Sequence, residues 1–128
     1  MIAYTMVGIR DLDRASDFYT PLFQEMGFKV CWRDEDCVSY GVVDDLSVPR
    51  FFVGYPFDGE AASVGNGTMT AFQLPEPRKV DRLYDIAMRQ GGSDEGKPGY
   101  RPRYGEGFYA AYVRDPDGNK LAFIVYDG

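Results

Sequence analysis

The most chemically active residue types gather in one glycine-rich segment, residues 99–107, with the sequence GYRPRYGEG. It carries the guanidinium groups of Arg101 and Arg103, the phenol of Tyr104 and the carboxylate of Glu106. Guanidinium groups donate paired hydrogen bonds to carboxylates and phosphates. A carboxylate in an apolar cavity can act as a general base. The segment therefore predicts a lid that presents arginine to a ligand, a catalytic loop, or an ordinary solvated surface loop.

The chain contains no histidine, so it lacks the commonest general base and the commonest transition-metal ligand. Histidine-based triads and histidine-containing metal sites are excluded. We take Glu106 and Tyr109 as the candidate catalytic residues, and we expect Asp115 to be fixed in a turn. Cys31 and Cys37 are expected to be free, small apolar residues, as is usual in a reducing compartment. The alternative is a disulfide across a hairpin, which has demanding geometry.

The elements that position these residues form a pattern that occurs twice along the chain. Residues 2–9 alternate like a strand, and a helical spacing of apolar residues then begins after Asp11 and ends at Gly27. Pro21 predicts a kink in this helix, or a break near Thr20. Three strand-like runs follow, with the sequences FKVCW, VSYGVV and RFFVGY.

The second half of the chain has the same order of elements. Residues 67–73 are typical of a strand, and a helix opens at Glu76-Pro77 and ends at Gly91-Gly92. A short strand near 93–96 precedes the strands 108–114 and 120–126, which the turn DPDGN joins. The sequence thus predicts one α+β domain over residues 1–128, built from two βαβββ modules at about 1–58 and 66–128. We expect a curved, mostly antiparallel eight-stranded sheet around a concave cavity, with the helices on the convex side.

Strand alternation predicts which side chains face that cavity. In the first, fifth and last strands, small, polar or irregular residues share one face, which we assign to the cavity, although both faces could be plain core. The large apolar residues on the other face, Val7, Ile9, Phe72, Leu121, Phe123 and Val125, should pack beneath the helices. The predicted ligand-binding residues are Tyr4, Met6, Met69, Ala71, Tyr109, Ala122 and Ile124, with Arg101, Arg103 and Tyr104 on the nearby loop.

Composition narrows the classes of partner. The 128 residues carry a net charge of −6, and no run of Lys and Arg is present. Nucleic acids and anionic membrane surfaces require such a run, so neither is an expected partner. No apolar stretch is long enough to cross a membrane. The N-terminal residues lack the basic and apolar regions of a signal peptide, and we expect a cytoplasmic protein.

Three stretches of the sequence resemble the vicinal oxygen chelate superfamily, also called the glyoxalase/bleomycin-resistance/dioxygenase fold. They are residues 8–30 with DLDRA and FY, residues 67–84 beginning GTMTAF, and residues 93–125 with RPRY and DPDGN. The resemblance implies paired βαβββ modules around a concave site and a homodimer. In enzymes of this superfamily, His, Gln or Glu from the first, fourth, fifth and eighth strands hold a divalent metal there.

This chain departs from that pattern at every position where the resemblance places a metal ligand. The first-strand position is Tyr4, the fifth-strand position is Met69 and the eighth-strand position is Ala122. The fourth-strand position falls within residues 50–53, which contain no carboxylate, amide or imidazole. Thioether sulfur prefers Cu(I), and a phenol with a pKa of about 10 stays protonated. We therefore expect no metal and no other cofactor.

The leading hypothesis is a superfamily protein that binds a small organic molecule in a metal-free cavity, as the bleomycin-resistance branch does. The second is an enzyme with a displaced metal site or a metal-free acid/base mechanism that uses Glu106 or Tyr109. The third is a metal-dependent enzyme of the lactoylglutathione-lyase or extradiol-dioxygenase kind, against which the three changed positions argue. A structural or partner-binding role is the fourth.

Overall fold

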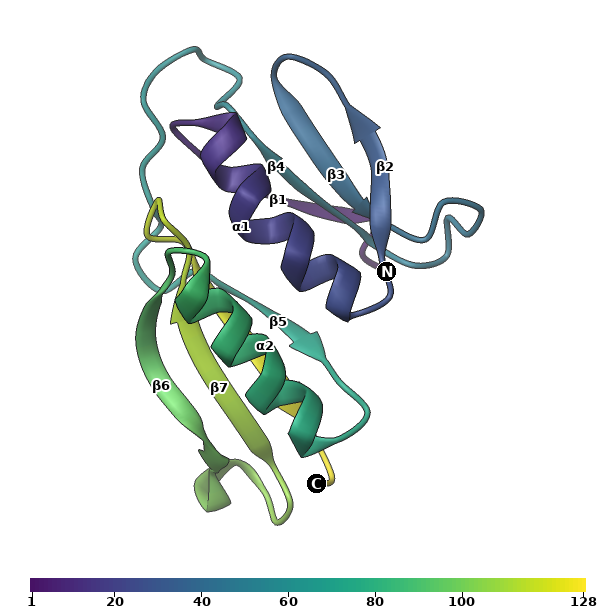
Figure 1. The fold of residues 1–128 in the computed structure, drawn as a ribbon, viewed down its shortest axis with the longest axis vertical. Helices are drawn as coiled ribbons and strands as arrows, with labels where there is room; N and C mark the ends of the chain where they lie inside the picture. Colours follow the sequence, from purple (N-terminus) through teal and green to yellow (C-terminus); the bar gives the residue numbers. More distant parts are fainter. The chain divides into compact units, whose positions relative to one another are not determined.

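The computed structural model describes all 128 residues and divides them into two compact units, residues 1–64 and 65–128. We call these units the N-terminal module and the C-terminal module. Each contains a strand, a helix and three further strands, in that order (Figure 1). The predicted α+β class and the repeated βαβββ pattern are thus confirmed.

The N-terminal module comprises β1 (Tyr4–Gly8), α1 (Leu12–Glu25), β2 (Lys29–Arg33), β3 (Cys37–Gly41) and β4 (Arg50–Gly54). Its sheet has the order β1-β4-β3-β2, in which β1 and β4 are parallel and the other pairs are antiparallel. The side chain of Asp11 caps α1 by accepting a hydrogen bond from the backbone N–H of Arg14, as expected for a short carboxylate at this position. Cys31 and Cys37 are free, as predicted.

The C-terminal module repeats this arrangement. It comprises β5 (Met69–Gln73), α2 (Pro77–Arg89), β6 (Ser93–Tyr100), β7 (Tyr109–Arg114) and β8 (Lys120–Val125), with a single 3-10 turn, η1 (Pro102–Tyr104), after β6. The sheet order is β5-β8-β7-β6, with β5 and β8 parallel and the rest antiparallel. Hydrogen bonds therefore join the eight strands into two mixed sheets of four.

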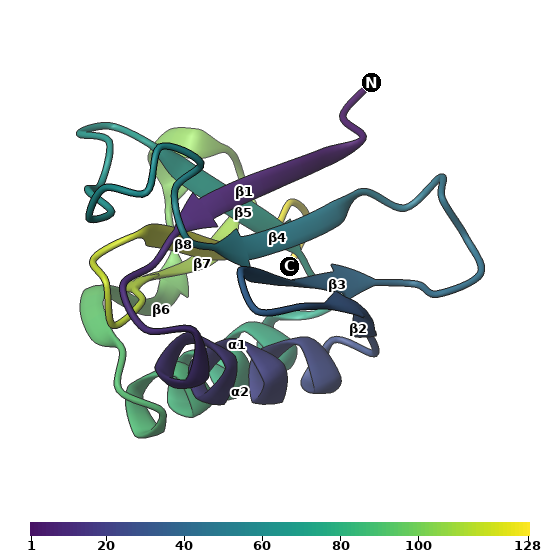
Figure 2. The same cartoon turned by 90° about the horizontal axis from the view of Figure 1, so that it is seen from above.

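Each helix lies along one face of its own sheet (Figure 2). Ile9, Leu121, Phe123 and Val125 are buried, as predicted, and Val7 and Phe72 are half-buried. Because successive strand residues point to opposite sides, the alternate residues of the same strands lie on the face away from the helix. No helix of the same module covers that second face, so its side chains are the ones available to form a binding site. Neither helix is long and apolar enough to cross a membrane.

Of the two outcomes predicted at Pro21, a break near Thr20 does not occur, because α1 continues past Pro21 to Glu25. A proline inside a helix removes one backbone hydrogen bond and costs about 3 kcal/mol. The residues around it, Phe18, Tyr19, Leu22 and Phe23, are all buried. Burial of each such side chain contributes about 1.5–3 kcal/mol, so packing outweighs the proline.

The sixth strand is longer than predicted. It runs from Ser93 to Tyr100, through Pro98 and Gly99, and its pairing with β7 is interrupted by irregularities around Gly96. Proline is tolerated because β6 is an edge strand, where one side of the backbone needs no partner. The first two residues of the predicted loop 99–107 consequently belong to the sheet.

Candidate functional site

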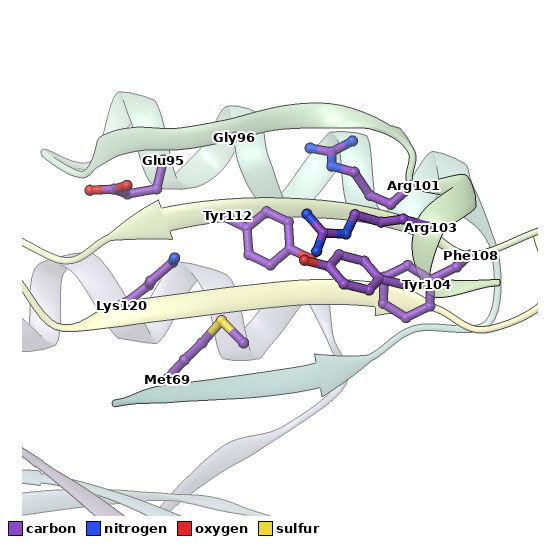
Figure 3. Close-up of a pocket in the computed structure, with 9 residues that line it drawn as sticks. All are labelled: Met69, Glu95, Gly96, Arg101, Arg103, Tyr104, Phe108, Tyr112 and Lys120. Atoms are coloured by element: carbon purple, nitrogen blue, oxygen red, sulfur yellow. The ribbon is translucent and has the colours of Figure 1, made fainter. Parts of the chain in front are cut away.

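A groove of about 690 Å³ lies on the face of the C-terminal sheet away from α2. All four strands of the module and the η1 segment contribute to it (Figure 3). We call it the C-terminal groove. Its lining residues are Met69, Glu95, Gly96, Arg101, Arg103, Tyr104, Phe108, Tyr112 and Lys120.

Aromatic rings form the centre of the groove, and cations lie over them. The guanidinium carbon of Arg101 and the Nζ atom of Lys120 are each 5.5 Å from the ring centroid of Tyr112. The guanidinium of Arg103 lies 5.1 Å from the centroid of Tyr104. These distances are within the range of cation–π attraction, which positions the three charges without neutralising them. Figure 3 shows the two arginines toward one end of the groove, and Lys120 toward the other.

The position of Arg101 depends on two glycines in β6. Its Nη2 atom donates a hydrogen bond of 2.7 Å to the backbone oxygen of Lys97. A Cβ atom on Gly96 would lie 3.3 Å from Nη2 and 2.9 Å from Cδ2 of Tyr112. A Cβ atom on Gly99 would lie 3.0 Å from Nη1. The glycines therefore leave the space in which the guanidinium lies across the strand.

The one carboxylate of the groove is already engaged. Arg114 donates from Nε to Oε1 of Glu95 at 2.6 Å, and from Nη1 to the backbone oxygen of Gly118 at 2.8 Å. The hydrogen bond and the charge of Arg114 lower the pKa of Glu95 below its ordinary value. Glu95 thus remains an ionised partner of Arg114 and is a poor general acid at neutral pH.

The groove has a net positive charge in an acidic chain. Arg101, Arg103 and Lys120 face the single carboxylate of Glu95, whereas the whole chain carries −6. The side chains of Arg103 and Lys120 lie over rings but form no hydrogen bond or ion pair. Their hydrogen-bonding capacity is available to a ligand, and Coulomb attraction favours an anion.

Four of the predicted binding residues line this groove: Met69, Arg101, Arg103 and Tyr104. Met69 is 46% exposed on β5, and Tyr104 packs edge-on against Phe108 with ring centroids 5.7 Å apart. The structure therefore brings the glycine-rich segment and the fifth strand together at one groove.

Ala122 and Ile124 occupy the predicted face of β8 but lie beneath the groove. They are 0% and 6% exposed, and with Ala110 they form a buried cluster. Phe108 and Tyr112 pack against this cluster and cover it. A ligand in the groove would contact these two rings, because they separate it from Ala122.

The two candidate catalytic residues are not among those that line the groove. Tyr109 lies on the opposite face of β7 to Tyr112, where its hydroxyl donates to Oδ1 of Asp81 on α2 at 2.5 Å. This hydrogen bond to a carboxylate raises the pKa of Tyr109 to about 12. Glu106 is exposed in the turn that follows η1. Neither geometry supports proton transfer to a ligand in the C-terminal groove.

The remaining predicted residues lie elsewhere. Tyr4 is 63% exposed on β1 and packs edge-on against Phe52, with centroids 5.0 Å apart. Met6 lines a separate hollow of about 410 Å³ in the N-terminal module, beside Phe57. Ala71 is exposed on β5 but does not line the C-terminal groove.

Asp115 is fixed in its turn, as expected. Its Oδ1 atom accepts hydrogen bonds from the backbone N–H groups of Asp117 and Asn119, at 2.9 and 2.8 Å. Its Oδ2 atom accepts a further bond from the side chain of Asn119 at 2.9 Å. The carboxylate is therefore occupied with holding the connection between β7 and β8 in shape.

Sequence reasoning missed Glu95, Gly96, Phe108, Tyr112 and Lys120 as lining residues. The pairing of β7 with β8 was the available signal for Tyr112, because Tyr112 is directly opposite Ala122. Residues opposite each other in an antiparallel pair share a face. Assigning Ala122 to the cavity face therefore implied Tyr112 there and Tyr109 on the other face.

The residues at the metal-ligand positions named by the resemblance do not fit a divalent ion. Tyr4 lies on β1, Met69 on β5 and Ala122 on β8, the strands to which they were assigned. The parallel pairing of β1 with β4 puts Phe52 on the Tyr4 face, while Arg50 donates to the backbone oxygen of Val42 at 2.9 Å. These are phenol, thioether, methyl and phenyl groups, which include no ligand that a hard or borderline divalent ion prefers. No group of three or more His, Cys, Asp or Glu side chains could hold a metal ion.

Comparison with known proteins places the chain in a family. The family model described as the glyoxalase/bleomycin resistance protein/dioxygenase superfamily matches residues 1–123. A crystal structure of a glyoxalase/bleomycin resistance protein from Albidiferax ferrireducens T118 is 29% identical, with a TM-score of 0.85 and 98% of each chain covered.

Two further solved structures are more distant. A glyoxalase-related enzyme from Fulvimarina pelagi is 20% identical with a TM-score of 0.75, over 98% of this chain and 87% of that one. A lactoylglutathione lyase from Agrobacterium tumefaciens is 20% identical with a TM-score of 0.70, over 98% and 92%. A search of curated proteins gave no match. Because the family model spans nearly the whole sequence, this chain belongs to the glyoxalase/bleomycin resistance protein/dioxygenase superfamily.

Proposed function

We propose that the protein binds a small organic molecule in the C-terminal groove, without a metal ion. The observation that carries this proposal is the lining of the groove: aromatic rings at its centre and two cationic side chains without a hydrogen-bonding partner. Ligand sites commonly combine apolar and aromatic walls with a few polar groups that fix orientation. A volume of about 690 Å³ is in the range of sites for small molecules.

The chemistry of the donors supports binding without a metal. A metal-dependent lyase or dioxygenase needs several oxygen or nitrogen ligands at one place. In this chain the corresponding positions hold Tyr4, Met69 and Ala122, and the carboxylate of Glu95 is paired with Arg114. We therefore do not extend the activity named for the Agrobacterium tumefaciens lyase to this chain.

An enzyme with a metal-free acid/base mechanism is less well supported. Such a mechanism requires a titratable group within hydrogen-bonding reach of the reacting atoms. Glu106 does not line the groove, and the hydroxyl of Tyr109 is committed to Asp81.

We also propose a homodimer, from the resemblance to the family. Light scattering during gel filtration should then give about twice the chain mass of 14.4 kDa.

Binding and metal content test this proposal together. Protein purified without a histidine tag should contain less than stoichiometric divalent metal by elemental analysis. A library of small aromatic compounds can be screened by the amide chemical shifts of the protein. It should contain ligands that shift the amide resonances of Gly96 and Lys120. Tyr112→Ala should abolish these shifts, whereas Tyr100→Ala, which removes an exposed ring outside the groove, should leave them unchanged. The proposal would be refuted by a stoichiometric metal ion, or by ligand-induced shifts that are unchanged in Tyr112→Ala.

A further inference from the structure

The charges around the C-terminal groove restrict which organic molecules it can take. Arg101, Arg103 and Lys120 all reach it, and the single opposing carboxylate, Glu95, is held by Arg114 at 2.6 Å. A cationic ligand would meet three like charges without a carboxylate free to receive it. An anionic ligand would instead gain charge-assisted hydrogen bonds and lose no existing ion pair.

The donors are unequally available, which indicates where an anionic group would lie. Arg101 already donates to the backbone oxygen of Lys97 and is confined by Gly96 and Gly99. Arg103 makes no hydrogen bond, and its guanidinium is held over the ring of Tyr104 at 5.1 Å. Its planar fork matches a carboxylate with two parallel hydrogen bonds. The arginine end of the groove is thus the better place for the anionic group.

The aromatic side chains of the groove indicate the shape of the rest of the ligand, beyond its anionic group. Tyr112 lies at the centre of the groove, and Phe108 and Tyr104 continue the apolar surface toward the arginines (Figure 3). Met69 adds a polarisable thioether on the other side, and thioethers contact aromatic rings favourably. Rings prefer offset or edge-to-face contact with other rings, so a flat conjugated body suits this surface.

We infer that the groove selects a planar aromatic carboxylate, whose carboxylate is bound by Arg103 with Arg101 and whose ring lies against Tyr112. This inference rests on the proposed function and narrows it to one chemical class. Lys120, at the opposite end, contributes a long-range attraction for the same charge. A neutral molecule of the same shape should bind more weakly, and a cationic one should not bind.

Four probes of known composition test the inference by calorimetry and by amide chemical shifts. They are 2-naphthoate, the neutral 2-naphthamide, the non-aromatic cyclohexanecarboxylate and the cationic 2-naphthylmethylammonium. Naphthoate should bind about tenfold or more tightly than naphthamide, which corresponds to one charge-assisted hydrogen bond. Cyclohexanecarboxylate should also be weaker, since it lacks the aromatic face, and inorganic sulfate should compete only at high concentration.

Substitutions that remove one positive charge at different places test whether Arg103 binds the carboxylate of the ligand. Arg103→Gln should weaken naphthoate binding roughly tenfold and leave naphthamide binding nearly unchanged. Arg103→Lys should recover only part of the loss, because it restores the charge but not the planar fork. Arg78→Gln removes the same charge from the exposed start of α2, outside the groove, and serves as the matched control. It should leave the affinity for naphthoate unchanged.

The outcomes separate this inference from the proposed function. Equal affinity for naphthoate and naphthamide, both lost in Tyr112→Ala, would overturn the anion selectivity while the groove remained a binding site. If Arg103→Gln and Arg78→Gln changed naphthoate binding equally, the assignment of the carboxylate to Arg103 would also be overturned. If none of the four probes shifts an amide of the groove at millimolar concentration, both this inference and the proposed function fail.

Discussion

At the scale of single residues, the absence of side chains at Gly96 and Gly99 defines the C-terminal groove as much as the charged groups do. A Cβ atom at Gly96 would be 2.9 Å from the ring of Tyr112, closer than real contacts permit. The ring has little freedom to retreat, because it packs on Ala110 and Ala122. A Cβ atom at Gly99 would meet only the flexible end of Arg101. The two positions should therefore differ in their tolerance of alanine.

Gly96→Ala is expected to lower the free energy of unfolding by about 1–2 kcal/mol, the usual cost of overpacking, and to weaken ligand binding by displacing Tyr112. Gly99→Ala should be nearly neutral for stability, since the guanidinium can move and alanine reduces the entropy of the unfolded chain. Urea denaturation monitored by circular dichroism measures the free energy of unfolding of both variants. Equal stability of the two variants would show that the Tyr112 ring is free to move aside.

Tyr109 provides a second test at this scale, through its pKa. The carboxylate of Asp81 accepts the hydrogen bond of the phenol and raises the pKa of Tyr109 to about 12 in the folded protein. The pKa of an unfolded tyrosine is about 10. A raised pKa in the folded state means that this stabilisation is fully present below pH 10 and is lost as pH rises toward 12.

In an ultraviolet titration of phenolate, the difference between wild type and Tyr109→Phe should therefore emerge near pH 12. Asp81→Asn should lower the pKa of Tyr109 toward the ordinary value, and Tyr109→Phe should cost about 1 kcal/mol of stability below pH 10. A difference curve centred near pH 10 in wild type would contradict the Tyr109–Asp81 contact.

The site was only partly predictable at the level of residues, and the reasons are physical. Arg101, Arg103 and Tyr104 could be identified as candidates because they stand together in one glycine-rich segment, a pattern that also fits a solvated surface loop. Tyr109 was placed on the wrong face because β7 was considered alone, without its pairing to β8. The burial of Ala122 depends on where the rings of Phe108 and Tyr112 lie, and alternation along one strand carries no information about that.

At the scale of elements, hydrophobic periodicity located both helices and seven of the eight strands closely. The exception was β6, whose sequence SDEGKPGY contains two glycines, a proline and three charged residues. Such residues favour loops when considered locally. The edge position of β6 and its pairing with β7 override that preference, and neither property is visible in a single segment of sequence.

The helix α1 yields a prediction about the cost of its internal proline. Pro21→Ala should raise the free energy of unfolding by about 1–2 kcal/mol, because alanine restores a backbone hydrogen bond to Asp17 and removes a steric conflict. The gain is smaller than the full cost of a helical proline, since alanine also makes the unfolded chain more flexible. Thermal and urea denaturation measure the change.

Pro77→Ala is the matched control for this prediction. Pro77 is the first residue of α2, where a backbone N–H would have no partner within the helix. The substitution should therefore give no gain, or a small loss. Equal gains in the two variants would mean that the position of a proline within its helix does not matter, and that Pro21 carries no special cost in α1.

At the scale of the whole molecule, the distribution of charge is more informative than its sum. The net charge of −6 conceals the positive groove of the C-terminal module. Attraction between exposed charges falls off over about 8–10 Å at physiological salt. An anionic ligand thus experiences mainly Arg101, Arg103 and Lys120, and its affinity should decrease as ionic strength rises.

Titration of tag-free protein with 2-naphthoate in the presence of excess EDTA, followed by amide chemical shifts, tests the central claim most directly. We expect saturable binding whose largest shifts are at the groove residues Gly96, Tyr112 and Lys120, with the same affinity before and after removal of metal ions. Binding that appears only after a divalent ion is added, or shifts confined to residues outside the groove, would contradict metal-free ligand binding at this site.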